Sequence, residues 1–115
     1  MEKRGLPLGR DPGDPYVQGL QALVRQPARE RLLDRLLVSA LIEARSEERL
    51  ALLGANLPDP EMRRFYSRLA DAESGHRELF LRLARRCEGF EARLGQMLRA
   101  QASLIRELPL PPAIH

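Results

Sequence analysis

The sequence predicts an all-α protein, and three observations support this prediction. Long stretches lack Gly and Pro, and they are rich in Leu, Ala, Arg and Glu, which all favour helices. Apolar residues recur at helical spacing, and no segment of useful length alternates as a strand would. Of the 115 residues, 43% are hydrophobic and 30% charged, a composition typical of one small folded domain rather than of a disordered chain.

The first elements are defined by residues that break or start helices. Gly and Pro recur through residues 1–14, so we expect this segment to be a flexible arm. Asp14 is a good N-cap, and Pro15 suits the first position of a helix. A short helix is therefore predicted from Pro15 to about residue 24.

Two long helices are predicted in the middle of the chain. The first spans residues 27–55 and ends near Gly54, because Gly favours helix ends. Asp59 and Pro60 provide the cap and first position of the next helix, which should reach residue 86. Because a short loop joins them, the two helices should be antiparallel neighbours.

A fourth helix is predicted over residues 89–107, followed by a proline-rich, extended tail over residues 109–115. Residues 15–108 should then form a helical half-bundle, in which two long antiparallel helices are flanked by shorter ones. A chain of this size buries one modest core, which argues against a large self-contained enzyme. This length leaves two alternatives, a small helical module or a piece that needs a partner.

The bulk properties limit the classes of partner. The net charge of +3 results from 19 basic and 16 acidic residues, so the basic excess is diluted compared with a dedicated nucleic-acid binder. No apolar run is long enough to span a membrane, and the first residues lack the apolar core of a secretory signal. The single cysteine, Cys87, excludes an internal disulfide and is expected to be an inert thiol. We therefore expect a cytoplasmic protein.

Charged residues interrupt the apolar faces of both long helices. Glu43 and Glu47 lie in the stripe of the first, while Glu73 and His76 lie in the stripe of the second, spaced i, i+3. Burying an ionised carboxylate without a partner costs several kcal/mol, so either a hydrogen-bond network or a metal ion should compensate. The apolar residues of the second stripe are Met62, Phe65, Leu69, Ala72, Leu79, Phe80 and Leu83.

A Glu-x-x-His motif on one bundle helix, with a single Glu from a neighbour, is half of a di-iron carboxylate ligand set. Carboxylates are hard ligands that bridge iron ions, and histidine adds a neutral nitrogen ligand. We therefore take Glu43, Glu73 and His76 as candidate metal ligands, with Glu47 as a further candidate. The alternatives are a hydrogen-bonded core histidine and, for Glu47, a pairing with Arg at the edge of the stripe.

Residues 31–84, above all the stretches LLDRLLVSALIEARS and RRFYSRLADAESGH, resemble the C-terminal half of the tRNA 2-methylthio-N6-isopentenyladenosine hydroxylase family. The resemblance implies a ferritin-like four-helix di-iron fold. It also implies hydroxylation of the isopentenyl group of a modified adenosine in tRNA, with iron as cofactor and O2 as co-substrate. Glu43 matches the single Glu ligand of this half, and Glu73 and His76 match its Glu-x-x-His motif.

The chain also departs from the family pattern. The family's first half brings a second single Glu and a second Glu-x-x-His, whereas His76 is the only internal histidine here. Glu47 stands where a Cys is expected, and Leu50 where Phe or a similar residue is expected nearby. Three hypotheses remain for completing the half-site: a homodimer that builds a four-helix bundle, a second half-bundle chain of a split enzyme, or a non-catalytic helical metal-binding or interaction protein.

Two further groups of residues have a functional and a structural interpretation. Phe65 and Tyr66 precede the ligands by about two turns and would form a pocket or radical relay, but core packing is the expected role. Five arginines are candidate contacts for tRNA, although solvated helix faces are expected because no aromatic stacking platform accompanies them. These are Arg63, Arg64, Arg68, Arg85 and Arg86.

Overall fold

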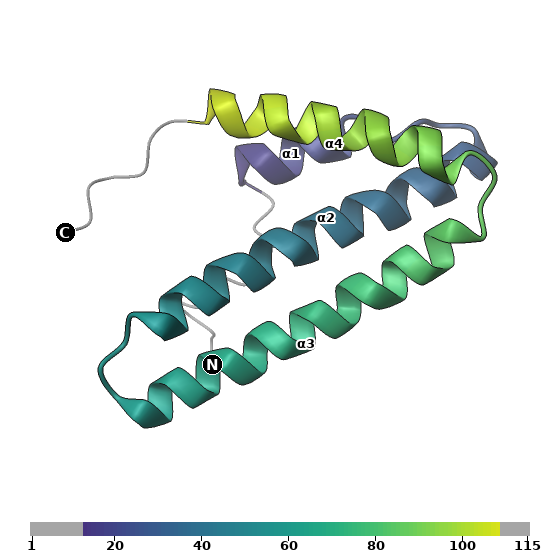
Figure 1. The fold of residues 1–115 in the computed structure, drawn as a ribbon. Helices are drawn as coiled ribbons and strands as arrows, with labels where there is room; N and C mark the ends of the chain where they lie inside the picture. The colour runs from purple at the N-terminus through teal and green to yellow at the C-terminus, as the bar shows by residue number, and fades with distance from the viewer. Residues whose placement is uncertain (1–12, 109–115) are drawn as a thin grey trace.

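The computed structural model describes residues 13–108, and over this range it contains four helices and no strand (Figure 1). The helices are α1 (Pro15–Gln21), α2 (Ala28–Ala55), α3 (Pro60–Arg85) and α4 (Phe90–Glu107). The predicted all-α class is confirmed. The predicted tail and nearly all of the predicted arm lie outside the described residues. None of these four helices is long and apolar enough to cross a membrane.

The helix starts follow the predicted caps. The Asp14 carboxylate accepts a hydrogen bond from the backbone N–H of Tyr16 at 2.8 Å, and Asp59 accepts one from Glu61 at 3.0 Å. Each cap is followed by a proline in the first turn, which is preorganised for a helix and needs no hydrogen-bond acceptor. Both predicted starts are therefore confirmed.

The first helix is shorter than the sequence pattern predicts. It ends at Gln21 rather than near Val24, because the chain tightens into turns in which Leu23 and Val24 donate to carbonyls three residues back. The next backbone N–H, that of Arg25, donates to Asp34 of α2 at 2.9 Å. This tertiary hydrogen bond fixes where the chain turns towards α2. A local sequence pattern cannot predict it.

The long helices α2 and α3 lie antiparallel, as predicted, and α1 and α4 lie together across α2 from α3 (Figure 1). The main core forms where α1, α2 and α4 meet, around fully buried side chains such as Tyr16, Leu20, Leu37 and Met97. The helix α3 contributes little to this core, since its only buried residues are Ala70 and Ala84.

The apolar stripe predicted on α3 is present, but much of it is exposed rather than buried. Met62, Phe65, Leu79 and Leu83 each keep 39–44% of their surface accessible. The helices instead approach through small residues: a Cβ added at Gly54 would lie 3.1 Å from the Cβ of Tyr66. Helix α3 therefore packs on α2 along one side and leaves an apolar side uncovered.

A buried ion cluster that the sequence analysis missed holds α4 and the α1–α2 connection onto α2. Asp34 is fully buried, and its carboxylate accepts hydrogen bonds of 2.9–3.0 Å from the guanidinium groups of Arg25 and Arg93. Burial favours a higher pKa, but these hydrogen bonds outweigh it and hold the pKa of Asp34 at about 2. The sequence does carry a signal for this cluster: Asp34 precedes the apolar residues Leu37 and Val38 by three and four positions, so its carboxylate lies on the apolar side of the helix.

Candidate metal centre

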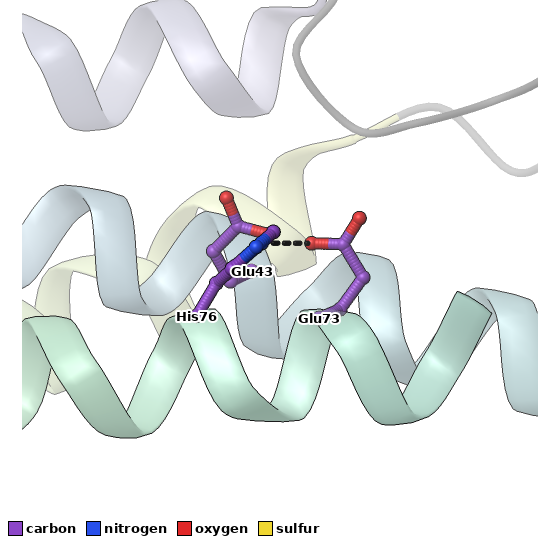
Figure 2. A group of neighbouring side chains, drawn as sticks. All are labelled: Glu43, Glu73 and His76. Carbon is purple, nitrogen blue, oxygen red and sulfur yellow. Dashed lines mark ion pairs between the residues drawn. The ribbon is translucent and has the colours of Figure 1, made fainter. Parts of the chain in front are cut away.

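Three of the four candidate ligands come together between the long helices. Glu43 reaches in from α2, and Glu73 and His76 from adjacent turns of α3 (Figure 2). Each offers one ligand atom, and all three atoms lie within 4.8 Å of one another. The Nδ1 atom of His76 is 3.8 Å from Oε1 of Glu43 and 3.7 Å from Oε1 of Glu73.

Helix geometry explains how these side chains meet. Positions i and i+3 lie on the same face, so Glu73 and His76 project from one side of α3. Glu43 lies near the middle of α2, and Glu73 near the middle of α3. Because the helices are antiparallel and joined by a short loop, their midpoints lie side by side. The interval of 30 residues between the two glutamates thus corresponds to one return of the hairpin.

The two carboxylates are shielded from water, whereas the imidazole is not. The side chains of Glu43 and Glu73 are 7% and 15% exposed, and that of His76 is 60% exposed. The distances from His76 to the glutamates exceed hydrogen-bond length. The predicted alternative of a hydrogen-bonded core histidine is therefore wrong: His76 closes the site from its solvent side.

One oxygen atom of the group is buried without a hydrogen bond to any described residue. Oε1 of Glu73 is buried and has no hydrogen-bond partner among the described residues. Such an atom is costly unless an ion or water satisfies it. Two sheltered carboxylates and an imidazole offer two hard oxygen ligands and one nitrogen ligand, a donor set that suits a divalent metal such as iron. The residues present therefore fit a metal ion.

Glu47 does not join this group. Its carboxylate forms an ion pair with the guanidinium of Arg77, which also contacts the hydroxyl of Ser74 at 3.2 Å. The side chains of Glu47 and Arg77 are both 28% exposed. The structure therefore agrees with the alternative interpretation, in which Glu47 pairs with an arginine at the edge of the stripe.

The aromatic pair beside the site divides between two environments. Phe65 and Tyr66 form an edge-to-face pair with centroids 5.2 Å apart. Tyr66 is half-buried against α2, but Phe65 is 40% exposed. Core packing is therefore the wrong expectation for Phe65, because it lies on the uncovered side of α3.

Two of the five candidate RNA-contacting arginines make structural contacts, and one of them, Arg85, lies over the ring of Phe90 at 5.9 Å from its centroid. The guanidinium of Arg63 donates hydrogen bonds of 2.9 Å to the carbonyls of Leu57 and Pro58, and so fastens the α2–α3 loop. All five arginines are exposed. The positive charges of Arg64, Arg68, Arg85 and Arg86 are spread along α3 and its C-terminal end.

Comparison with known proteins identifies related sequences. The chain is 44% identical over 84 residues to the tRNA 2-(methylsulfanyl)-N(6)-isopentenyladenosine(37) hydroxylase of Pseudomonas putida, covering 73% of this chain and 40% of that protein. It is 34% identical over 107 residues to the protein of the same name from Salmonella typhimurium, covering 91% of this chain and 39% of that protein. No solved structure matches the chain.

The chain thus spans about two fifths of the length of these curated relatives. The family model for tRNA-(MS[2]IO[6]A)-hydroxylase (MiaE) matches residues 1–115, the whole of the sequence. The match includes the two helices that bring Glu43, Glu73 and His76 together. The chain therefore belongs to the tRNA-(MS[2]IO[6]A)-hydroxylase family.

Proposed function

We propose that this chain forms part of a metal-dependent hydroxylase that acts on the isopentenyl group of a 2-methylthio-N6-isopentenyladenosine in tRNA. The observation that carries this proposal is the convergence of Glu43, Glu73 and His76, in a chain whose relatives are named as hydroxylases of that nucleoside. The family model and the relatives support the tRNA substrate, and the donor set supports the metal.

We assign the metal to iron, with O2 as co-substrate. Bound iron would supply the activation of O2 that hydroxylation of an unactivated carbon needs. One oxygen atom would enter the substrate and the other would leave as water, with two electrons and two protons supplied from an external donor. In this chain Glu43 and Glu73 would provide oxygen ligands, and His76 a nitrogen ligand at the exposed edge of the site.

The described residues provide half of the usual ligand set. A di-iron carboxylate site in a four-helix bundle takes a Glu from each of two helices and a Glu-x-x-His from each of two others. The helices α2 and α3 supply one of each. A second pair of helices with the same ligands is therefore part of the proposal.

Turnover on the modified tRNA tests the proposed function. The protein, loaded with ferrous ion and given O2 and a reductant, should add one oxygen atom to the isopentenyl group, detected by mass spectrometry of the digested nucleosides. Glu73→Ala should lower the yield by about 100-fold or more, because one ligand is lost. Glu47→Ala removes a carboxylate one turn from Glu43 that pairs with Arg77, and it is the matched control.

A second outcome would favour a different function. Only three candidate ligands meet among the described residues, which also suits a non-catalytic helical protein that binds metal structurally or serves as an interaction module. Iron bound in normal amount with no oxygen added to the nucleoside would favour this alternative. Equal turnover by the wild type and Glu73→Ala would contradict the assigned ligands.

A further inference from the structure

We infer that a second copy of this chain completes the metal centre by packing its α3 against the uncovered side of α3. The contact surface is the α3 stripe, defined as Met62, Phe65, Leu69, Leu79 and Leu83. The inference rests on the proposed metal centre and adds the partner that supplies its missing ligands.

The first observation is where the site opens. The carboxylates of Glu43 and Glu73 are sheltered, while His76 is 60% exposed and lies in the middle of the α3 stripe. Four members of the stripe are 39–44% exposed, and Leu69 is half-buried. Single exposed apolar residues are ordinary, but a continuous line of them along one helix marks a contact surface. The metal-ligating group is therefore open towards the same side of α3 on which the apolar stripe is exposed.

The second observation is the symmetry of the stripe about the site. Leu69 and Phe65 precede Glu73 by four and eight residues, and Leu79 and Leu83 follow His76 by three and seven. In an antiparallel contact between two copies, residues before the site meet residues after it. Phe65 would then face the partner's Leu83, and Leu69 the partner's Leu79. A surface that complements itself in this way suits a two-fold dimer.

The third observation is the position of the ligands along their helices. Glu43 is residue 16 of the 28 in α2, and Glu73 is residue 14 of the 26 in α3. A two-fold axis through the site therefore aligns each long helix with its copy over nearly its whole length. A 26-residue helix extends about 39 Å, so the contact would be long and without overhang.

The ligand count agrees with this arrangement. One copy contributes two glutamates and one histidine, and two copies contribute four glutamates and two histidines, the complete di-iron set. Without the second copy, a metal ion would have only these three side chains among the described residues. A second copy would therefore supply both the remaining ligands and a cover for the exposed apolar side of α3.

Mass in solution, measured together with iron content, tests the second copy. Light scattering after gel filtration, without oxygen and with excess ferrous ion, should give the mass of two chains, and elemental analysis two iron ions per dimer. Leu79→Glu places a charge in the stripe and should give a monomer that binds iron at least tenfold more weakly. Leu98→Glu on α4 is the matched control, since Leu98 is 43% and Leu79 44% exposed. It should remain a dimer.

Circular dichroism of both variants checks that the helices are retained. The inference is wrong if the folded wild type stays monomeric at all concentrations, if a different polypeptide proves to be the partner, or if Leu98→Glu rather than Leu79→Glu dissociates the dimer. An active, iron-loaded monomer would overturn the dimer and leave the proposed function intact. A dimer with two iron ions and no hydroxylation would support the dimer and contradict the proposed function.

Discussion

At the scale of single residues, two buried carboxylates on α2 show how the environment decides what a charge does. Asp34 accepts hydrogen bonds from two arginines and is fully satisfied. Glu43 instead lies with Glu73 and His76, and Oε1 of Glu73 has no hydrogen-bond donor among the described residues. The first arrangement stabilises the fold, and the second is suited to a cation.

The Asp34 cluster predicts a large loss of stability on substitution. Asp34→Ala leaves Arg25 and Arg93 without their shared carboxylate, and Arg93 is only 16% exposed. Removing one partner of a buried ion pair costs about 3 kcal/mol. Urea unfolding should report this loss. Asp71→Ala, at an exposed carboxylate on α3, should change the free energy of unfolding by less than about 0.5 kcal/mol. Equal effects of the two variants would contradict the cluster's role.

The same residue gives the unfolding free energy a defined pH dependence. The pKa of Asp34 is about 2 in the folded protein, below its ordinary value of 3.8. Because the folded pKa is lowered, the stabilisation is complete above about pH 4 and is lost as the pH falls towards 2. The stability difference between the wild type and Asp34→Asn should shrink by roughly 2 kcal/mol over this interval.

At the scale of helices, the two sides of α3 lie in different environments, one packed against α2 and the other uncovered. One side lies against α2 so closely that a Cβ at Gly54 would approach Tyr66 and the carbonyl of Arg63. The side that carries the α3 stripe has no cover among the described residues. Gly75, between the two ligands of α3, has no atom within 4 Å of an added Cβ. These environments predict different effects of the same substitution.

Replacing each glycine by alanine measures this difference. Gly75→Ala should raise the free energy of unfolding by about 0.5–1 kcal/mol, because alanine favours a helix interior and meets open space. Gly54→Ala should show no such gain, since its Cβ would lie 3.1 Å from Tyr66 Cβ and force the helices apart. Thermal unfolding of both variants gives the comparison. A similar gain at both positions would mean that α2 and α3 do not approach as described.

The helices were predictable from the sequence to within a few residues because their signals are local. Asp14–Pro15 and Asp59–Pro60 fix two starts, and the Glu-x-x-His spacing places Glu73 and His76 on one face. The exposure of Phe65 and the Asp34 cluster were not predictable, because both depend on which helices pack together. Arg25 and Arg93 are 9 and 59 residues from Asp34 and give no local pattern.

At the scale of the whole molecule, the residues described form a helix pair supported from one side. The helices α1 and α4 complete the core on one face of α2, and the metal-ligating group opens beside the uncovered face of α3. The chain spans about two fifths of its relatives' length, and residues 13–108 bring together one set of candidate ligands. The central claim is therefore that Glu43, Glu73 and His76 act together as one metal-binding unit.

Iron content after anaerobic loading and gel filtration tests this claim most directly. The wild type should retain about one iron ion per chain, as expected for half of a two-metal site. Glu43→Gln, Glu73→Gln and His76→Ala should each retain less than about a tenth of that amount, because each removes one ligand. Glu47→Gln should match the wild type, since Glu47 pairs with Arg77 outside the group. A folded wild type that retains no iron, or ligand variants that retain as much as Glu47→Gln, would contradict the account.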